Sequence, residues 1–556
     1  MKKKFLLSFM MASMMLSAQN TIYVNTSGSD TNDGLTAGTP VLTLAKAIAL
    51  SSSATTNIYL SAGTYMQTAA TSLNALSNIN LTISGESASN TTISTTTAGI
   101  RLLVANAAPF TTSANTVTIR NLTFSGANIT ANGGFGGAIL FNQGVSNTMQ
   151  SSLILENMIF DNNTVSAAGT LAGGALSTNF KNVTITSCYF KNNQALTTST
   201  SATGGAIFVG PINNATGDTS GSFVNISNTT FDGNVATSKG GAVLVNNNVG
   251  PSTLPAVRPY AKFTNCTFVN NKVLSQPTDA TTNIKNGSAI FFNSGTTASM
   301  YKFNFTIANC TFAQNQGGSE TGNGSVWESK SAIQFDGTNW TSATLVNNII
   351  APSLTANCGT TLSVSTAESN KFTAGYNAIE SVDALITDAT FGIDLVINHN
   401  YLAILNPSNL DAALTDNSTG SVFAVPYLGL PTVSLAINAG TNSFGSPNIV
   451  PSTDVREVGI VGSIKDMGAY EFGGAAGFLD TKQNNALSIY PKPTLSTLYI
   501  DSNDVQKVDI YSISGKKLQS VSDAKNAINV AGLESGLYLI NIKTAGKTYI
   551  QTFIKK

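Results

Sequence analysis

Residue types that could catalyse a reaction are scarce in this 556-residue chain. Asp, Glu, Lys and Arg together make up 10% of it, and the one histidine is His399, in VINHNYL. A histidine-based metal centre is therefore excluded, and His399 is expected to be a structural or surface side chain. The motifs GxSxG, HExxH and CxxC do not occur. The chemistry available is that of carboxylates, amines and guanidinium groups.

Three charged side chains are predicted to form one row along the fold. In three successive repeats, the residue after a recurring phenylalanine is Asp161, Lys191 and Asp232. Polysaccharide lyases and glycosidases need acids gathered in one groove, often with a basic residue, so this trio is the candidate catalytic site. The simpler interpretation is a stack in which Lys191 relieves the repulsion of two carboxylates, and such exposed pairs contribute only ~0 to 1 kcal/mol.

Two further carboxylates, Asp30 and Asp33, lie in a loop rich in Gly and Asn. They could hold a structural calcium ion. They are more often turn residues that accept hydrogen bonds from nearby backbone N–H groups. No cofactor is therefore predicted, with calcium as the one exception kept open.

The recurring phenylalanine belongs to a repeat in which apolar residues alternate with period 2, as a half-buried strand requires. The alternation slips by one residue near an asparagine that stands three positions before the phenylalanine. Asparagine tolerates the left-handed backbone conformation that a bend demands. The predicted columns are Phe124, Phe160, Phe190, Phe231, Phe268, Phe312 and Ile350, and, three residues earlier, Asn121, Asn157, Ser187, Asn228, Asn265, Asn309 and Asn347.

A second motif, GGAI, keeps step with the first. Copies start at 136, 173, 204 and 240, with weaker copies at 287 and 330, so the period is 31 to 47 residues. Paired glycines fit a tight turn where backbones approach closely, and the apolar residues after them predict another strand. Two strands per repeat predict a solenoid of stacked coils whose strands pair in parallel ~4.8 Å apart.

The paired GGAI and FxxN motifs resemble the repeats of polymorphic outer-membrane proteins. The FxxN copies are FDNN, FKNN, FDGN, FVNN and FAQN, and the resemblance covers residues 117 to about 350. It implies an all-β protein built as a right-handed parallel β-helix, which we place at residues 20–380.

The opening YVNTSGSDTNDGLTAGTPVLTLAKAIAL resembles the start of pectate-lyase-like β-helix proteins. Thr39 suits the N-cap of a helix and Pro40 its first position. An amphipathic helix is expected to plug the open end of the solenoid with Leu42, Leu44, Ala45 and Ile48.

Residues 381–472 are predicted to close the C-terminal end of the β-helix. AINAG, TDVRE and DMGAYE resemble the closing segment of choice-of-anchor Q domains, with Asn438 where that family usually has Asp. Four charges gather in this charge-poor chain. We interpret them as a fixed ion-pair network, with a catalytic site as the alternative: Asp454, Arg456, Asp466 and Glu471.

Residues 487–556 follow a linker at 473–486 and predict a small β-sandwich of four or five short strands. The stretches IYPKPT, VDIYSISGKKL, GLYLINI and FIKK resemble a type A sorting domain of the type IX secretion system, with departures at Lys492 and at Leu495–Ser496. The resemblance implies export by the type IX machinery and, after removal of the domain, attachment to surface glycolipid. It assigns the sorting signal to Tyr490, Pro491, Pro493, Gly515, Gly536, Tyr538, Lys555 and Lys556.

Residues 1–19 predict a secretory signal peptide, because three lysines precede an apolar run that ends near small residues. No other apolar stretch reaches the ~18 to 20 residues of a membrane-spanning helix. The 28 Lys and Arg balance the 28 Asp and Glu, so there is no basic stripe for a nucleic acid.

Two phrases, NCTFVNN and NCTFAQN, place Cys266 and Cys310 two residues before the phenylalanine, in the same inward column as Cys188. Cysteine there is a small apolar filler. A disulfide between Cys266 and Cys310 is the alternative, since neighbouring coils lie ~4.8 Å apart. Cys358 lies outside the pattern and is expected to be a separate free thiol.

The preferred function is a secreted or surface-attached, non-enzymatic protein, adhesin-like, that binds glycans, cells or host matrix. The alternative is a secreted polysaccharide lyase or glycoside hydrolase acting in a groove along the β-helix. Three or more acids, or acids with Arg or Lys, converging in one groove would favour the enzyme.

Overall fold

The computed structural model describes residues 20–473 and 489–555 apart from loop segments, the longest of which are 211–222, 247–259, 275–286, 319–330 and 380–399. The predicted signal peptide, most of the linker, Cys358 and His399 lie outside the described residues. The chain divides into two compact units, residues 1–475 and 476–556.

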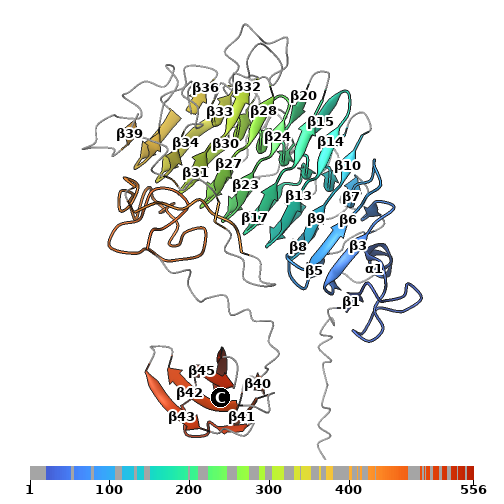
Figure 1. Ribbon diagram of the computed structural model, residues 1–556, viewed down its shortest axis with the longest axis vertical. Coiled ribbons are helices and arrows are strands. Elements are labelled where there is room, and N and C mark those ends of the chain that lie inside the picture. Colours follow the sequence, from blue (N-terminus) through green and yellow to red (C-terminus); the bar gives the residue numbers. More distant parts are fainter. Residues whose placement is uncertain are drawn as a thin grey trace, which may run out of the picture. The chain divides into compact units, whose positions relative to one another are not determined.

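In the first unit, each coil adds one strand to each of several parallel sheets, so the predicted parallel β-helix is confirmed (Figure 1). Sheet A consists of β1 (Asn20–Val24), β2 (Thr55–Leu60), β5 (Asn80–Gly85), β8 (Thr116–Arg120), β12 (Ser152–Glu156), β17 (Asn182–Thr186), β22 (Phe223–Ser227), β26 (Tyr260–Thr264), β30 (Phe303–Ala308), β34 (Trp340–Val346) and β37 (Phe372–Gly375). Sheet B follows it in each coil and consists of β3 (Gly63–Met66), β6 (Thr91–Ser94), β9 (Thr123–Ser125), β13 (Ile159–Asp161), β18 (Tyr189–Lys191), β23 (Thr230–Asp232), β27 (Thr267–Val269), β31 (Thr311–Ala313), β35 (Ile349–Ile350), β38 (Ala378–Ile379) and β39 (Tyr401–Leu402). Because β39 still pairs with β38, the β-helix extends past the predicted boundary at residue 380.

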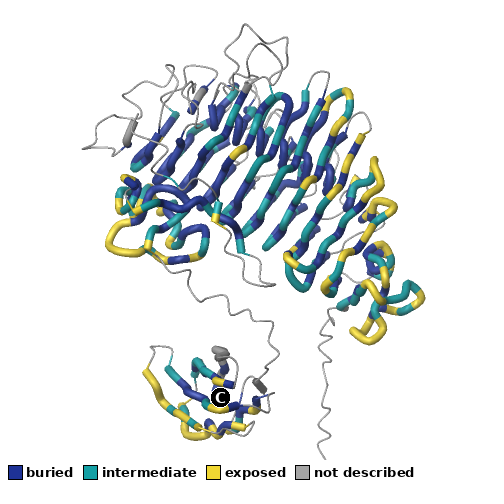
Figure 2. The backbone as a smooth tube through the Cα atoms, viewed as in Figure 1, coloured by how far each residue is buried: buried dark blue, intermediate teal, exposed yellow. Residues whose placement is uncertain are grey.

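The remaining sheets complete each coil. Sheet D consists of β10 (Asn128–Ile129), β14 (Thr164–Ser166), β19 (Gln194–Leu196), β24 (Val235–Ala236), β28 (Lys272–Leu274) and β32 (Gln316–Gly318), and the small sheet E of β15 (Thr170–Ala172) and β20 (Ser201–Thr203). Sheet C consists of β4 (Thr71–Ser72), β7 (Leu103–Asn106), β11 (Ile139–Asn142), β16 (Leu176–Thr178), β21 (Ile207–Val209), β25 (Val243–Asn246), β29 (Ile290–Asn293), β33 (Ile333–Asp336) and β36 (Leu362–Val364). The strands bury one set of alternating side chains inside the coil (Figure 2).

The phenylalanine column forms a continuous stack through the core. From Phe124 to Phe312, neighbouring rings lie 4.6 to 5.7 Å apart and nearly parallel. At the bend between sheets A and B, every residue of the predicted asparagine column has a φ between 48° and 56°. The row alignment predicted from the sequence is therefore confirmed, with its left-handed corner.

A second asparagine ladder, three residues after each phenylalanine, was not predicted as a structural element. From Asn163 to Asn271, each buried side-chain amide donates to the amide oxygen of the next coil over 2.9 to 3.1 Å. It also donates to a phenylalanine carbonyl in the preceding coil, as Asn163 does to Phe124. These bonds satisfy the polar groups at the second corner inside the core. The ladder consists of Asn163, Asn193, Asn234, Asn271 and Asn315.

At the N-terminal end, helix α1 (Leu44–Leu50) packs Leu44, Ala47 and Ile48 into the core, as expected of a plug. Its predicted start is wrong. Thr43 is the N-cap, and its Oγ1 accepts from the Lys46 N–H. The carboxylate of Asp30 accepts from the Leu42 and Thr43 N–H groups and from the Thr43 hydroxyl, so it fixes the cap three residues beyond Pro40. Leu42 and Ala45 are exposed.

The second unit is antiparallel and has its own core. Sheet F consists of β40 (Ile489–Tyr490), β41 (Thr497–Ile500) and β44 (Ala527–Asn529), and sheet G of β43 (Lys517–Ser522), β42 (Val505–Ser512), β45 (Gly536–Thr544) and β46 (Thr548–Lys555), in that order. The predicted small β-sandwich is confirmed, but its described residues form seven strands and not the four or five expected. Among the described residues, no helix is long and apolar enough to cross a membrane.

Candidate functional site

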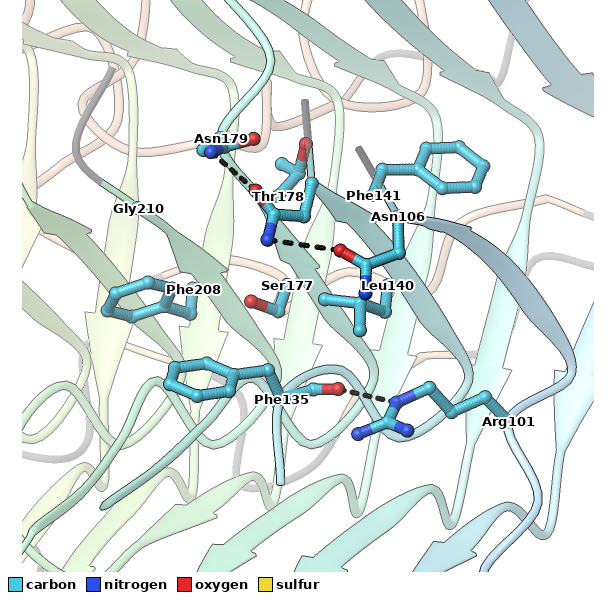
Figure 3. A pocket seen from close by; sticks show the side chains of 11 residues that line it. Arg101, Asn106, Phe135, Leu140, Phe141, Ser177, Thr178, Asn179, Phe208 and Gly210 are labelled. Carbon is cyan, nitrogen blue, oxygen red and sulfur yellow. Dashed lines mark hydrogen bonds between the residues drawn. The ribbon is translucent and has the colours of Figure 1, made fainter. Parts of the chain in front are cut away.

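A cleft of about 460 Å³ opens on the outer face of sheet C, over strands β7, β11, β16 and β21. This volume lies within the usual range for small-molecule sites. Aromatic rings, side-chain amides and one guanidinium group line it (Figure 3). The lining residues are Arg101, Asn106, Phe135, Leu140, Phe141, Asn142, Ser177, Thr178, Asn179, Phe208 and Gly210.

Small residues in two outward columns of sheet C account for the hollow. In register, Ser177 lies between Leu140 on one coil and Phe208 on the next. In the neighbouring column, Gly210 follows Asn106, Asn142 and Asn179, where a side chain would otherwise continue the row. A Cβ at Gly210 would approach the Phe208 ring to 3.1 Å. The surface of sheet C is therefore recessed at Ser177 and Gly210, the small residues of two neighbouring coils.

The amides beside this recess form a ladder at its edge. The Asn142 amide donates to the Asn106 Oδ1 over 3.3 Å, and the Asn179 amide donates to the Asn142 Oδ1 over 2.8 Å (Figure 3). These bonds fix the side-chain planes along the cleft. Each of these amides carries both donor and acceptor groups.

Two aromatic rings stand on the other side of the cleft. The rings of Phe135 and Phe208 have centroids 6.3 Å apart and planes tilted by 59°. Both belong to the wall rather than to the core stack, so their faces are available beside the polar edge (Figure 3).

Arg101 supplies the charge of the cleft. Its Nε donates to the carbonyl oxygens of Phe135 and Gly136 over 2.8 and 3.1 Å, which fixes the guanidinium plane. Burial lowers the pKa of Arg101. Among the described residues that line the cleft, Arg101 alone is charged, and no described carboxylate pairs with it. Buried charges in proteins are usually paired, so an Arg101 without a described counter-charge is the unusual feature of this cleft.

The structure brings the predicted trio together as a row, outside this cleft. Asp161 pairs in register with Lys191, and Lys191 with Asp232, on the outward side of sheet B. Asp232 accepts from the Tyr189 hydroxyl and the Asn270 amide, and Asp161 accepts from the Asn162 amide. Burial raises the pKa of Asp161, and the Lys191 charge offsets this in part. The fixed partners fit a stacked row better than a catalytic groove.

The Asp30 and Asp33 carboxylates act within their loop. Asp33 accepts from the Leu35 N–H and the Thr39 hydroxyl over 3.1 Å. Asp30 caps the entry to α1 with both oxygens. Among the described residues, no group of three or more His, Cys, Asp and Glu side chains has a spacing that could hold a metal ion. The hydrogen bonds of these two carboxylates fit the turn interpretation.

Residues 424–473, which we call the side strap, do not lie where the sequence predicted. The strap was expected to close the C-terminal end, but it runs along the flank of sheets A and B (Figure 1). The Asn265 and Asn347 amides of the corner column donate to the carbonyls of Thr453 and Thr441 over 2.9 and 2.8 Å. The Thr311 hydroxyl accepts from a strap N–H over 2.9 Å. The strap covers several coils at once.

One ion pair of the predicted network is present inside the strap, and the other two carboxylates accept backbone N–H bonds. Arg456 pairs with Asp454 over 2.7 Å, and it also donates to the Glu471 carbonyl over 2.6 Å. The Tyr427 and Tyr470 rings lie 5.1 and 4.0 Å from its guanidinium carbon. Burial raises the pKa values of Asp466 and Glu471, whose carboxylates accept backbone N–H bonds. The network is fixed inside the strap and away from the cleft.

The outward columns carry a signal for the strap. After the phenylalanine, the residue changes from Asp161, Lys191 and Asp232 to Val269 and Ala313. The later, apolar positions are buried, although they face away from the core. An outward column that turns apolar predicts a covering segment. The cleft has a weaker signal, which is the break in an asparagine column at Gly210.

Three of the residues assigned to the sorting signal occupy described positions in sheet G. Gly536 begins β45 and pairs with Lys555 at the end of β46. The Tyr538 hydroxyl donates to the Glu534 carbonyl, and its ring stacks on Phe553. Tyr490 lies in β40. Pro491, Pro493, Gly515 and Lys556 lie outside the described residues.

Comparison with solved structures returns polysaccharide lyases. The chain aligns to a pectate lyase, Pel9A, with 16% identity over 81% of this chain and 96% of that chain, at a TM-score of 0.32. It aligns to a rhamnogalacturonan lyase with 13% identity, covering 64% and 87% of the two chains, at a TM-score of 0.28. It also aligns to a PL6 family alginate lyase, AlyGC, with 13% identity, covering 72% and 57%, at 0.22. TM-scores this low carry no argument about this chain.

No curated protein matches the sequence. A family model does match its C-terminal part: residues 488–556 match the secretion system C-terminal sorting domain. This stretch corresponds to the second compact unit and to the predicted type IX domain. The chain thus carries a type IX sorting domain, which indicates export to the cell surface or secretion.

Proposed function

We propose that the exported β-helix binds an acidic glycan in the cleft on sheet C. The observation that carries this proposal is Arg101, a cation that is half-buried, oriented and without a described carboxylate partner. A sugar carboxylate would accept two parallel hydrogen bonds from a guanidinium edge. The carboxylate would then compensate the Arg101 guanidinium for the hydration that it loses on burial.

The other walls of the cleft suit the rest of a sugar. The apolar C–H face of a pyranose packs on an aromatic ring, and Phe135 and Phe208 offer two such rings. Sugar hydroxyls both donate and accept, as do the Asn106, Asn142 and Asn179 amides on the opposite edge. A saccharide in the cleft would meet ring, amide and guanidinium groups.

Binding without turnover is the function that the cleft chemistry favours. Acid–base cleavage of a glycan needs a positioned acid and base. Among the described lining residues there is no Asp, Glu, His, Lys or Tyr. Exported display of such a module agrees with an adhesin-like role, in which the β-helix holds a glycan at the cell surface.

The alternative, a uronate lyase, has one observation in its favour. A lyase would remove the proton from C5 of a uronate while the oxygen on C4 leaves, forming a C4–C5 double bond. Arg101 is the sole ionisable group among the described lining residues, and burial lowers its pKa. Rising ultraviolet absorbance of unsaturated product from polygalacturonate or alginate would establish this alternative.

The binding proposal is tested with variants of Arg101 and Phe208. Arg101→Ala removes charge-assisted hydrogen bonds worth ~1.5 to 3 kcal/mol, so affinity for oligogalacturonate or oligoalginate should fall roughly 10- to 150-fold in isothermal titration. Arg101→Lys should retain part of the affinity, and Phe208→Ala should weaken binding through lost ring contact. The matched control is Arg120→Ala, an exposed arginine on β8, which should change nothing.

Equal affinity of Arg101→Ala and the native protein for these acidic probes would contradict the proposal. So would a loss of the same size in the Arg120→Ala control, because it would indicate a general charge effect.

A further inference from the structure

The outer face of sheet G in the sorting unit concentrates positive charge. Along β42, Val508 and Ile510 point into the core, so Lys507 and Asp509 point outward. In register with them stand Lys543 on β45 and Ser520 on β43. Lys517 begins β43 opposite Tyr511. We call the surface around Lys507, Lys517 and Lys543 the lysine face.

Two of these lysines are held in place. Asp509 lies between them and is 3.2 Å from each ammonium group. The Ser520 hydroxyl also donates to this carboxylate, and together these partners lower the pKa of Asp509. The Lys507 and Lys517 side chains remain 44% and 46% exposed. The ammonium groups are therefore oriented and still accessible.

The arrangement leaves positive charge uncompensated. Lys507 is directly opposite Lys543 across the β42–β45 ladder, and like charges in that position destabilise a sheet. Asp509 pairs with Lys507 and Lys517, and no described carboxylate pairs with Lys543. The unit as a whole holds nine Lys and five Asp or Glu over residues 487–556, whereas residues 20–486 hold 16 Lys or Arg and 23 Asp or Glu. An anionic partner would relieve this repulsion.

The shape of the face favours an extended partner over a small ion. Lys507 and Lys517 meet at Asp509, whereas Lys543 lies on a third, adjacent strand of the same sheet, so the positive charge extends over three strands. Leu518, next to Lys517, is 41% exposed and adds an apolar side chain. Amines beside an exposed leucine match a bilayer surface, where phosphates lie above the acyl chains.

We propose that the lysine face docks the sorting domain on an anionic lipid surface. This inference is independent of the glycan cleft, which lies in the other unit. The domain indicates export, so such a surface lies on its route. The lysines would pair with headgroup phosphates, and Leu518 would enter the headgroup boundary.

The test is co-sedimentation of the full-length protein with phosphatidylglycerol and phosphatidylcholine vesicles. The native protein should bind the anionic vesicles and release from them at high salt. Each lysine near an anionic surface contributes roughly fivefold, so K507Q/K517Q/K543Q should bind about a hundredfold more weakly. The matched variant K507R/K517R/K543R keeps the charge and should bind as the native protein does.

A second control removes three lysines from the β-helix, as K46Q/K262Q/K272Q, and should leave vesicle binding unchanged. Equal vesicle binding by the native and K507Q/K517Q/K543Q proteins would overturn the proposal. Equal binding to neutral and anionic vesicles would overturn it too. Binding to soluble heparin without binding to anionic vesicles would assign the face to an acidic polysaccharide and refute the lipid surface.

Discussion

At the residue scale, the small side chains in the inward column two positions before each phenylalanine form hydrogen bonds between coils. The Cys188 and Cys266 thiols donate to carbonyls of their own and the preceding coil. The Cys310 sulfur accepts from the Cys266 N–H over 3.5 Å, as the Thr229 hydroxyl does from Cys188. These three cysteines are free and buried, so the alternative of a Cys266–Cys310 disulfide is wrong. The column needs a small side chain that also bonds between coils.

This packing predicts unreactive thiols in the native protein. Burial raises the pKa of Cys188 to about 12 and that of Cys310 well above its usual range. At pH 8 a thiol with such a pKa carries ~10³-fold less thiolate than an exposed cysteine. An aromatic disulfide reagent should therefore react with these thiols only after unfolding. Rapid reaction of more than one thiol in the folded protein, or fewer than three thiols in the unfolded, unreduced chain, would contradict the packing.

At the element scale, the GGAI motif sets the distance between coils. Its first glycine has a φ of 61° to 68° at residues 136, 173, 204 and 240. At the second glycine, a Cβ would lie 1.9 to 2.2 Å from a carbonyl oxygen of the next coil. Neither position accepts a side chain, for two different reasons. Sheet C, and with it the floor of the cleft, is held at this spacing.

Gly205→Ala should therefore be strongly destabilising. Its Cβ would lie 2.1 Å from the Gly241 carbonyl oxygen and 2.6 Å from Val235, so the coils must separate. The free energy of unfolding of the first unit should fall by ~3 kcal/mol or more, measured by urea with the fluorescence of the buried Trp340. The control is Gly459→Ala, where a Cβ meets nothing within 4 Å. A similar urea midpoint for both variants would refute the close approach.

Features that recur in every coil could be predicted from the sequence, whereas features that occur once could not. A row such as Phe190 to Phe231 recurs in every coil, so alignment alone predicts its register, and the structure confirms it. The predicted start of the helix was wrong because the carboxylate of Asp30, 13 residues before Thr43, fixes the N-cap there. The position predicted for the side strap was wrong because its contacts, such as that of Thr230 with Pro426, join segments far apart in the chain. The cleft arises where single positions, such as Ser177 and Gly210, depart from the repeat. An alignment of repeats shows what the coils share and does not predict such positions.

At the scale of the whole molecule, the chain forms two units with separate cores, and each unit carries a different feature. The β-helix holds the long sheets on which the cleft lies, and the second unit carries the sorting domain. Their charge differs in sign, since acids exceed bases in residues 20–486 and bases exceed acids in residues 487–556. The ligand proposed for the cleft is acidic, and the unit that holds the cleft is acidic too. Binding would therefore depend on a local positive charge, that of Arg101.

The most direct test of this account varies the charge of the ligand and of the cleft together. Isothermal titration would compare an oligogalacturonate with its fully methyl-esterified, neutral counterpart, on the native protein and on Arg101→Ala. The account predicts at least ~10-fold tighter binding of the acidic form by the native protein, and loss of that preference in Arg101→Ala. Equal binding of both ligands by the native protein, or a preference that survives Arg101→Ala, would contradict it.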